Sequence, residues 1–536
     1  MFLSKKFRYA LSISSGVLLI LSFPFTGGLA FLGFIAWVPL LLVENSILQA
    51  KLRSGKVFVH AYLAFFIYNI GTTFWIYFAS PEGAYMAILI NSLFMSLAFY
   101  AYHLARKRFN SNWGWLFLPV FWVGFEHMHY HWELSWPWLT LGNIFSIYPK
   151  LVQWYEVTGV MGGSIWLLVV NHLIFSYIIK YNQGGVSLGS RRNFLQLGKV
   201  LFALLIPVTF SLIRFYTYTE KKDPVQVAVI QPNIDPYNEK FVEDPSAQIE
   251  KMLSLAKNVQ SPQTNFILFP ETAISSSVEE SYLQKNESVS SFLKFTETYP
   301  HIHLLTGAST YAFFDKKHSI ASKQINGTNN FIEFYNSSLS IEGNQTDVVH
   351  KSKLVLGVEK IPFTEWFPFF EDLSINNGGT SGSLGHEDVP RTMKSKYGSY
   401  APIVCYESIY GEFISQQVQK GAELLFIITN DGWWKDTPGH KQHNSFASIR
   451  AIETRRSVAR SANTGISSLI NQRGEIIQQS SWWKVETLKA SLNKNRVKTI
   501  YVQWGDFFYR FLSMLAAAFI LAIIVIRVRS LFRTSK

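Results

Sequence analysis

Residues 401–412 read Ala-Pro-Ile-Val-Cys-Tyr-Glu-Ser-Ile-Tyr-Gly-Glu, an apolar run that ends at the single cysteine of this 536-residue chain. The pattern predicts a buried strand over Pro402–Cys405 and a helix over Ser408–Lys420. We therefore expect the Cys405 sulfur at a strand-to-helix turn near a helix N-terminus, where a thiolate is stabilised. A single cysteine excludes an internal disulfide and a cysteine-based metal module, so Cys405 is either a buried, unreactive thiol or a nucleophile.

Two other polar side chains stand out by their surroundings. Glu271 follows Phe-Ile-Leu-Phe-Pro at 266–270, so we expect it at a sheet edge, where burial raises a carboxyl pKa toward that of a general base. The alternative is an acidic residue that only stabilises a helix N-terminus. Lys351, in His-Lys-Ser-Lys at 350–353, could offer a fixed positive charge to an oxyanion, with Glu359 holding it in place. Its alternative is a solvated lysine on a strand or loop.

From Asp223-Pro224 onward, short β-rich runs alternate with helical ones. The predicted strands are Val225–Ile230, Phe266–Phe269, His303–Leu305, Phe334–Ile341, Pro402–Cys405, Leu424–Thr429 and Ile466–Ile470. The predicted helices are Ala247–Val259, Ser288–Thr298, Ser408–Lys420 and Gln442–Arg456. This alternation predicts an α/β domain with its own core, and the polar stretch Ser374–Gly385 predicts a loop within it.

Eight apolar stretches are long enough to cross about 30 Å of hydrocarbon, near residues 9–25, 28–44, 57–78, 84–104, 113–128, 160–180, 198–216 and 506–526. With eight crossings, all the clusters of Lys and Arg fall on one side, which should be cytoplasmic. We thus predict a bundle of seven transmembrane helices in 1–216, an external domain in 217–505, and one helix with a basic cytoplasmic tail in 506–536. A cleavable N-terminal signal peptide is disfavoured, because no small-residue cleavage site followed by a soluble stretch is present.

The net charge of +13 does not point to a nucleic-acid partner. Residues 1–200 hold 14 Lys and Arg against 5 Asp and Glu, and the tail after residue 525 holds 4 basic residues and no acidic ones. The remaining part has 31 of each sign and is neutral. The excess lies beside the apolar stretches, as expected of a membrane protein.

The order and surroundings of Glu271, Lys351 and Cys405 resemble the Glu-Lys-Cys triad of the nitrilase, or carbon–nitrogen hydrolase, superfamily. The similarity covers about residues 225–480 and includes Val-Ala-Val-Ile-Gln-Pro-Asn at 227–233, Cys-Tyr-Glu at 405–407, Asn-Asp-Gly-Trp-Trp at 430–434 and Arg-Ser-Ala-Asn-Thr-Gly at 460–465. Such a domain between seven N-terminal helices and one C-terminal helix is similar to the apolipoprotein N-acyltransferases. The resemblance implies an αββα domain on the periplasmic side of a bacterial inner membrane.

The resemblance also implies roles for single residues. Glu271 would be the general base, Lys351 the oxyanion stabiliser and Cys405 the nucleophile. The supporting positions would be Glu359, Tyr406 and Glu407, and the substrate-binding positions Trp433 and Phe241. The chain departs from the common Leu-Val-Pro-Phe-Gly-Glu pattern at 354–359, where it reads Leu-Val-Leu-Gly-Val-Glu, so the loop carrying Glu359 is expected to differ. Residues 133–143 resemble the family's external loop, with an interfacial aromatic belt as the alternative.

The implied reaction is ping-pong acyl transfer through a thioester on Cys405. A phospholipid would donate the acyl group, and the α-amino group of a diacylglyceryl-modified cysteine on an apolipoprotein would accept it, without metal or cofactor and in a monomeric protein. A membrane-tethered nitrilase-type amidase or hydrolase, with water as acceptor, is the alternative. A catalytically inactive lipoprotein-binding scaffold is disfavoured because all three triad positions hold competent residues. A transporter is disfavoured because few ionisable residues lie in the apolar stretches.

Overall fold

The computed structural model describes residues 3–109, 114–183, 190–364, 366 and 382–534. The chain folds into two compact units. The first, the helical unit, comprises residues 1–77, 81–216 and 506–536. The second, the α/β unit, comprises residues 78–80 and 217–505.

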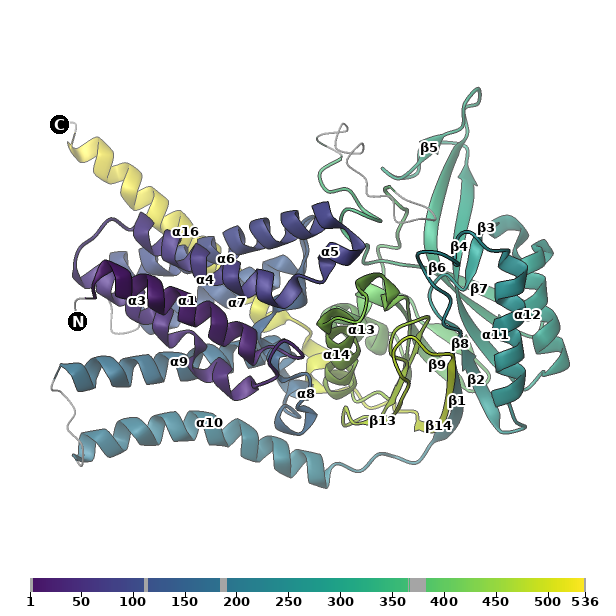
Figure 1. Cartoon of the computed structure of the whole chain (residues 1–536), viewed down its shortest axis with the longest axis horizontal. Helices are drawn as coiled ribbons and strands as arrows, with labels where there is room; N and C mark the ends of the chain where they lie inside the picture. The colour runs from purple at the N-terminus through teal and green to yellow at the C-terminus, as the bar shows by residue number, and fades with distance from the viewer. Residues whose placement is uncertain (1–2, 110–113, 184–189, 365, 367–381, 535–536) are drawn as a thin grey trace. The chain divides into compact units, whose positions relative to one another are not determined.

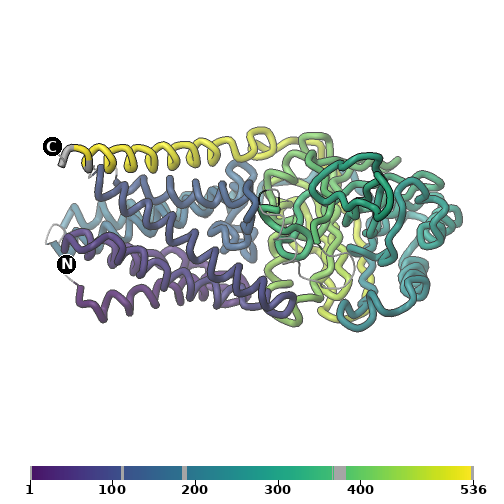
Figure 2. The backbone as a smooth tube through the Cα atoms, turned by 90° about the horizontal axis from the view of Figure 1, so that it is seen from above, coloured from purple at the N-terminus to yellow at the C-terminus, as the bar shows by residue number. Residues whose placement is uncertain are grey.

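The helical unit has a helix in each of the eight predicted apolar stretches (Figure 1). The longer helices are α1 (Lys5–Ser22), α3 (Val38–Gln49), α4 (Gly55–Thr73), α6 (Pro81–Phe109), α7 (Phe117–His129), α9 (Met161–Asn182), α10 (Arg191–Thr217) and α16 (Phe507–Thr534). Short helices α2 (Gly33–Ala36), α5 (Ile76–Ala79) and α8 (Tyr155–Thr158) lie between them. Helix α16, the last segment of the chain, packs against α7 and α6 and runs along the edge of the helical unit in Figure 2.

Five segments of the described chain are long and apolar enough to cross a membrane. They are Ala30–Gln49, Pro81–Phe109, Met161–Asn182, Arg191–Thr217 and Phe507–Ser530. The other predicted crossings coincide with α1, α4 and α7, which are not among these five; α7, for example, has only 13 residues. The apolar helical character of this part is therefore established, whereas the count of eight crossings stays a prediction.

Polar and aromatic side chains are packed inside the helical unit. Glu44 is fully buried; it forms an ion pair with Arg106 and lies 2.7 Å from His103 Nδ1. Because Arg106 neutralises the charge of Glu44 inside the bundle, this buried glutamate is not evidence for a transport path through the helices. Trp138 is fully buried and stacks on Trp136 with ring centroids 5.6 Å apart. A fully buried ring argues against an interfacial position for Trp138 itself.

The α/β unit contains two sheets. The larger sheet has the order β14-β1-β2-β4-β6-β5, with β3 paired to β4 and β7 to β6. Its strands are β1 (Pro224–Gln231), β2 (Thr264–Leu268), β3 (Ile274–Glu279), β4 (His303–Phe314), β5 (Lys323–Gln324), β6 (Phe331–Glu342), β7 (Gln345–His350) and β14 (Glu486–Asn493). The smaller sheet, in the order β13-β12-β11-β10-β9-β8, consists of β8 (Met393–Ser395), β9 (Gly398–Val404), β10 (Leu424–Thr429), β11 (Val458–Ala462), β12 (Ser468–Ile470) and β13 (Ile476–Gln479).

The two sheets pack face to face, and helices cover their outer faces, which confirms the predicted αββα domain. Alternate residues of β1 divide between two cores, as a strand buried on both faces requires. Val227 and Val229 meet Phe426 and Ile428 of β10 between the sheets. Ala228 and Ile230 instead meet the helices α11 (Pro245–Val259) and α12 (Glu287–Thr298). Helices α13 (Gly411–Gln419) and α14 (Pro438–Thr454) lie beside the smaller sheet, and α15 (Ile500–Trp504) precedes the return to the helical unit.

Several predicted boundaries are wrong. The strand predicted to end at Cys405 ends at Val404, because Cys405 has a φ of 51° and begins a short 3-10 helix, Cys405–Ile409. The following helix consequently begins at Gly411 instead of Ser408. Strand β11 was not predicted, because its sequence Val-Ala-Arg-Ser-Ala buries an arginine and a serine and lacks an apolar pattern. Of the loop predicted over Ser374–Gly385, residues 374–381 lie outside the described part of the chain.

Candidate active site

The predicted site residues follow the ends of strands that belong to both sheets. Glu271 lies three residues after the end of β2, Lys351 directly after β7, and Cys405 directly after β9. The strands β2 and β9 run parallel to their neighbours β1 and β10. Carboxyl ends of parallel strands lie at one edge of a sheet, which places Glu271 and Cys405 at the edges of their own sheets. Lys351 follows β7, which pairs antiparallel with β6.

The amino group of Lys351 lies between two buried carboxylates. Lys351 Nζ donates to Glu271 Oε1 at 3.1 Å and to Glu359 Oε1 at 2.9 Å. Asn336 Nδ2 bridges the same two oxygens at 2.8 and 2.7 Å. The second oxygen of Glu271 accepts from the backbone N–H of Asn430 at 3.0 Å. Such a network fixes each carboxylate by several hydrogen bonds and leaves the lysine little freedom to move.

The charges in this cluster support one another. Burial alone would raise the pKa of Glu271, but Lys351, Asn336 and Lys240 together hold it below its usual range. Burial likewise opposes the charge of Lys351, yet Glu271 and Glu359 raise the Lys351 pKa above its ordinary value. Both groups are therefore ionised at neutral pH. The predicted rise of the Glu271 pKa is wrong, because Lys351, Asn336 and Lys240 outweigh the effect of burial.

The Cys405 thiol is buried at the same place. Burial above all, and next the negative charge of Glu271, raise the pKa of Cys405 well above its usual value, with Lys351 opposing them. The resting sulfur is consequently a thiol that needs a base to become a nucleophile. The predicted stabilisation of a thiolate at this turn is therefore wrong, because burial and Glu271 both disfavour the negative charge. Its backbone has a φ of 51°, an unusual conformation for a residue other than glycine. A sharp turn of this kind lets a side chain project from the end of a strand.

A second polar cluster supports the turn at Cys405. His443 of α14 lies with Nε2 3.2 Å from the Cys405 carbonyl oxygen and with Nδ1 2.9 Å from Asp431 Oδ1. Asp431 also forms a fully buried ion pair with Arg460 of β11. Burial opposes ionisation of Asp431, but Arg460 and His443 lower its pKa below the usual range. The buried positions of His443 and Arg460 were not predicted, because charged residues in polar stretches ordinarily face solvent.

Glu407 holds the Cys405 turn against the segment that carries Lys351. One carboxylate oxygen accepts from the backbone N–H of Val404 at 2.7 Å, and the other from those of Ser352 at 2.6 Å and Lys353 at 3.3 Å. Burial raises the pKa of Glu407 to about 7. Its neighbour Tyr406 is buried, with its ring 5.4 Å from that of Tyr410. Glu407 thus contacts backbone N–H groups, and these contacts hold the Cys405 turn next to the segment that carries Lys351.

The loop carrying Glu359 forms a tight turn. Val355 N–H donates to Glu359 Oε2 at 2.8 Å, and Glu359 N–H returns to the Val355 carbonyl at 2.9 Å. Gly357 within this turn has a φ of 82°, which glycine adopts without strain. The altered sequence at 354–359 therefore still delivers the carboxylate to Lys351.

Lys240 is a buried lysine that was not predicted as a site residue. It is only 3% exposed, and its Nζ donates to the Glu271 carbonyl oxygen at 3.0 Å. Burial lowers the pKa of Lys240 to about 8, although Glu271 and Cys405 partly counteract this effect. The feature of the sequence that could have indicated a role for Lys240 is its position next to Phe241, in the segment after the first strand.

The two predicted substrate-binding residues lie close together. The rings of Phe241 and Trp433 are nearly parallel, 16° apart, with centroids separated by 6.5 Å. Tyr237 packs edge-on against Trp433 and donates its hydroxyl to the Trp433 carbonyl oxygen at 2.6 Å. Phe241 and Tyr237 keep 36% and 40% of their surface exposed. These three residues form an aromatic patch that can contact an apolar ligand.

The fold and this cluster define the class of protein. Residues 226–501, slightly more than half of the chain, match the family model "Carbon-nitrogen hydrolase". The chain belongs to the carbon–nitrogen hydrolase family. Residues 15–173 match a second family model, "Apolipoprotein N-acyltransferase N-terminal domain".

Two relatives are similar to this chain over nearly its whole length. The chain is 29% identical over 517 residues to the apolipoprotein N-acyltransferase of Chlorobaculum tepidum, covering 94% of each chain. It is 27% identical over 507 residues to the apolipoprotein N-acyltransferase of Geobacter metallireducens, covering 93% of this chain and 92% of the relative. The resemblance to the apolipoprotein N-acyltransferases is thereby confirmed over both the helical and the α/β part.

Proposed function

We propose that this protein is a membrane-embedded acyltransferase that moves an acyl group from a phospholipid to the α-amino group of a diacylglyceryl-cysteine at the N-terminus of an apolipoprotein. The observation that carries the proposal is the buried cluster in which Lys351 bridges Glu271 and Glu359 beside the Cys405 thiol. The relatives that match nearly the whole chain, and the match of residues 15–173 to the N-terminal family model, support the substrate class. The apolar helices suit substrates anchored by acyl chains, which partition into a bilayer.

In the first half-reaction, Glu271 takes the proton from the Cys405 thiol, and the sulfur attacks the ester carbonyl of the phospholipid. The carbonyl oxygen becomes an oxyanion, which the ammonium group of Lys351 stabilises. The C–O bond of the ester then breaks, and the leaving alkoxide receives the proton held by Glu271. The products are a thioester on Cys405 and a lysophospholipid.

In the second half-reaction, the lipoprotein amine attacks the thioester. Glu271 accepts a proton from the attacking nitrogen while Lys351 again stabilises the oxyanion. The C–S bond breaks, the thiolate regains its proton, and an amide of the lipoprotein leaves. Because Glu359 and Asn336 form hydrogen bonds with Lys351 and Glu271, respectively, we assign them positioning roles. Trp433 and Phe241 are assigned to acyl-chain contact, Tyr406 to packing beside the nucleophile, and Glu407 to holding the turn.

A direct experiment uses the purified full-length protein with a phospholipid and a diacylglyceryl peptide that has a free α-amine. We expect an N-acylated peptide and an equal amount of lysophospholipid. Formation of free fatty acid with the peptide unchanged would support the hydrolase alternative and contradict the proposal.

The charge of Lys240 predicts a pH dependence of the first half-reaction. With a pKa of about 8, Lys240 is an ammonium below that pH and neutral above it. Its charge lies beside Glu271 and Cys405, so it favours the negative charge that develops when the thiol loses its proton. The initial burst of lysophospholipid, measured without acceptor, should slow as pH rises through about 8. In Lys240→Met this burst should be slower below pH 8 and should lack the decline near that pH.

The matched control is Lys251→Met, which removes an exposed lysine of α11. It should reproduce the rate and the pH profile of the wild type. A decline near pH 8 that persists unchanged in Lys240→Met would show that another group is responsible.

Close packing behind Glu271 gives a second prediction. A Cβ atom at Gly307 of β4 would lie 2.4 Å from Thr272 N and 2.6 Å from Glu271 Cα, too close to be accommodated without backbone movement. Gly307→Ala should therefore displace the carboxylate and lower the acylation rate on the order of 10²-fold. Gly198→Ala, where a Cβ would meet nothing within 4 Å, is the control and should leave the rate unchanged. Wild-type rates in Gly307→Ala would contradict this account of Glu271.

The basic clusters predict the orientation in the membrane. We propose that both termini are cytoplasmic, that the chain crosses the bacterial inner membrane eight times, and that residues 217–505 are periplasmic. Reporter fusions at residue 536 and in the exposed loop at Asn326 should then report opposite compartments. If both fusions report the same side, the number of crossings is wrong.

A further inference from the structure

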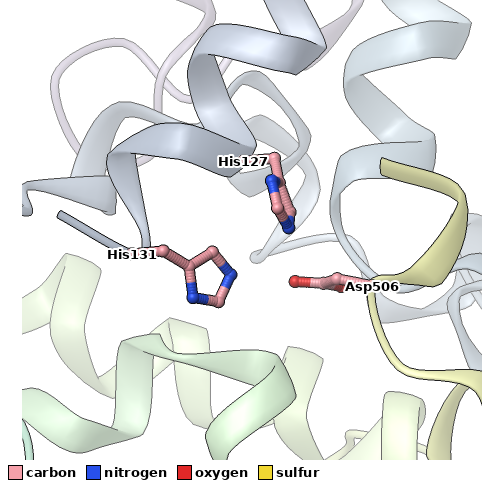
Figure 3. Close-up of side chains that lie close together, drawn as sticks. All are labelled: His127, His131 and Asp506. Carbon is pink, nitrogen blue, oxygen red and sulfur yellow. The ribbon is translucent and has the colours of Figure 1, made fainter. Parts of the chain in front are cut away.

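We propose that His127, His131 and Asp506 bind a divalent transition-metal ion of the zinc class, at a site that the proposed acyl transfer does not use. One ligand atom from each residue lies within 4.8 Å of the other two. All three residues belong to the helical unit. Figure 3 shows the two imidazole rings and the carboxylate directed toward a common point.

The hydrogen bonds of His127 determine which ring nitrogen can bind a metal. His127 Nδ1 lies 2.9 Å from Ser513 Oγ. Ser513 has one hydroxyl proton, and its oxygen also lies 3.0 Å from the Gly124 carbonyl and 3.2 Å from the Tyr509 carbonyl, which can only accept. The proton is used there, so Ser513 Oγ accepts a hydrogen bond from His127 Nδ1–H. The neutral ring then carries its lone pair on Nε2.

That lone pair is buried. His127 is 7% exposed, and its Nε2 has no hydrogen-bond partner among the residues that the structure describes. Figure 3 shows this nitrogen facing the carboxylate of Asp506 and the ring of His131. Buried polar atoms in folded proteins are nearly always paired, and a bound cation would pair this one.

The three side chains form a suitable ligand set. His127 lies in α7, and the turn that follows this helix continues to His131. The backbone N–H of His131 donates to the Met128 carbonyl oxygen at 2.9 Å. Residues four apart face the same side of a helix, and the two rings lie 4.6 Å apart between centroids. Asp506 supplies a carboxylate directly before α16. Two imidazoles and one carboxylate, with a fourth position left for water, is a common zinc coordination, and a hydrogen-bonded second nitrogen as in His127 is its usual support.

The ligand atoms must approach one another slightly. Around a tetrahedral zinc ion with bonds of about 2.0–2.1 Å, ligand atoms lie about 3.3 Å apart. His131 is exposed, so its ring is the one that can turn to close the site. The ion would tie the end of α7 to the start of α16, two helices that pack against each other.

A comparable cluster in the α/β unit, formed by Cys405, Asp431 and His443, is a poor competitor. Asp431 is already neutralised by Arg460, and both nitrogens of His443 lie within hydrogen-bond distance of oxygen atoms. A metal ion there would have to displace a buried guanidinium group.

Metal titration of the full-length protein in detergent tests the proposal. After treatment with a chelator, Zn²⁺ binding is measured by isothermal titration, and Co²⁺ is used as a spectroscopic substitute. We expect one equivalent of Zn²⁺ per chain and a visible Co²⁺ absorption band typical of four-coordinate geometry. Both signals should disappear in His131→Ala, which changes an exposed residue, and in Asp506→Asn.

Two controls identify the site. Cys405→Ala removes the competing cluster, and His318→Ala removes an exposed histidine of the α/β unit. Both should bind Zn²⁺ as the wild type does. Absence of stoichiometric binding in the wild type, or binding that survives in His131→Ala and Asp506→Asn, would overturn the proposal. Loss of binding in Cys405→Ala would also overturn it and would assign the metal to the other cluster.

Discussion

Replacing the single cysteine should abolish both the acyl-enzyme and the transferred product. In Cys405→Ala the thioester cannot form, and the rate should fall to background, because the reaction has no other nucleophile in the cluster. The substitution suits the position, since alanine and cysteine face a similar cost at a φ of 51°. Lysophospholipid release and peptide acylation are measured together, with the melting temperature as the test of folding. An active Cys405→Ala protein would contradict nucleophilic catalysis by this residue.

Loss of Lys351 should have the next largest effect. Removing a single oxyanion donor typically costs about 10²–10³-fold in rate. Lys351→Ala also leaves Glu271 and Glu359 as two buried carboxylates without the ammonium group that holds them. Repulsion between them raises the pKa of the pair and disturbs the base. We therefore expect a loss on the order of 10³-fold or more in the rate of the acylation burst.

Lys353→Ala is the matched control for Lys351→Ala. It removes a lysine two residues away, whose ammonium lies 5.4 Å from the centre of the Tyr410 ring instead of in the carboxylate cluster. Its burst rate should stay within a few fold of the wild type. Similar losses in the two variants would indicate a general effect of charge on the segment and would contradict a specific role of Lys351.

The sequence was most informative where strands end. Glu271 and Cys405 each follow a buried apolar strand that runs parallel to a neighbour, and such residues lie at the carboxyl edge of a sheet. Lys351 instead follows β7, which pairs antiparallel with β6. The partners of these residues were harder to predict. Asn336 lies in the middle of β6 within a run of polar residues, so no periodicity marks it as the group that bridges Glu271 and Glu359. Its contacts depend on tertiary structure alone.

Most of the other residues whose positions could not be predicted from the sequence are buried charged residues. Lys240, Arg460 and His443 look like solvent-facing residues in the sequence, and only the three-dimensional arrangement of opposite charges makes their burial possible. The strand β11 was missed for the same reason, since Arg460 interrupts it. In the helical part, hydropathy located the eight longer helices but not the short helix α8, which lies between two predicted stretches. Length and composition alone support five crossings and leave the other three dependent on charge placement.

The most direct test of the central claim is a burst experiment with mass analysis of Cys405. Phospholipid is mixed with the full-length protein without acceptor, and the quenched protein is digested and searched for an acyl adduct. We predict one equivalent of lysophospholipid per enzyme, an acyl group on the peptide that contains Cys405, and discharge of that group by a diacylglyceryl peptide with a free α-amine but not by the same peptide with its amine acetylated. Continuous release of lysophospholipid without acceptor, or an acyl group on any other residue, would contradict acyl transfer through Cys405.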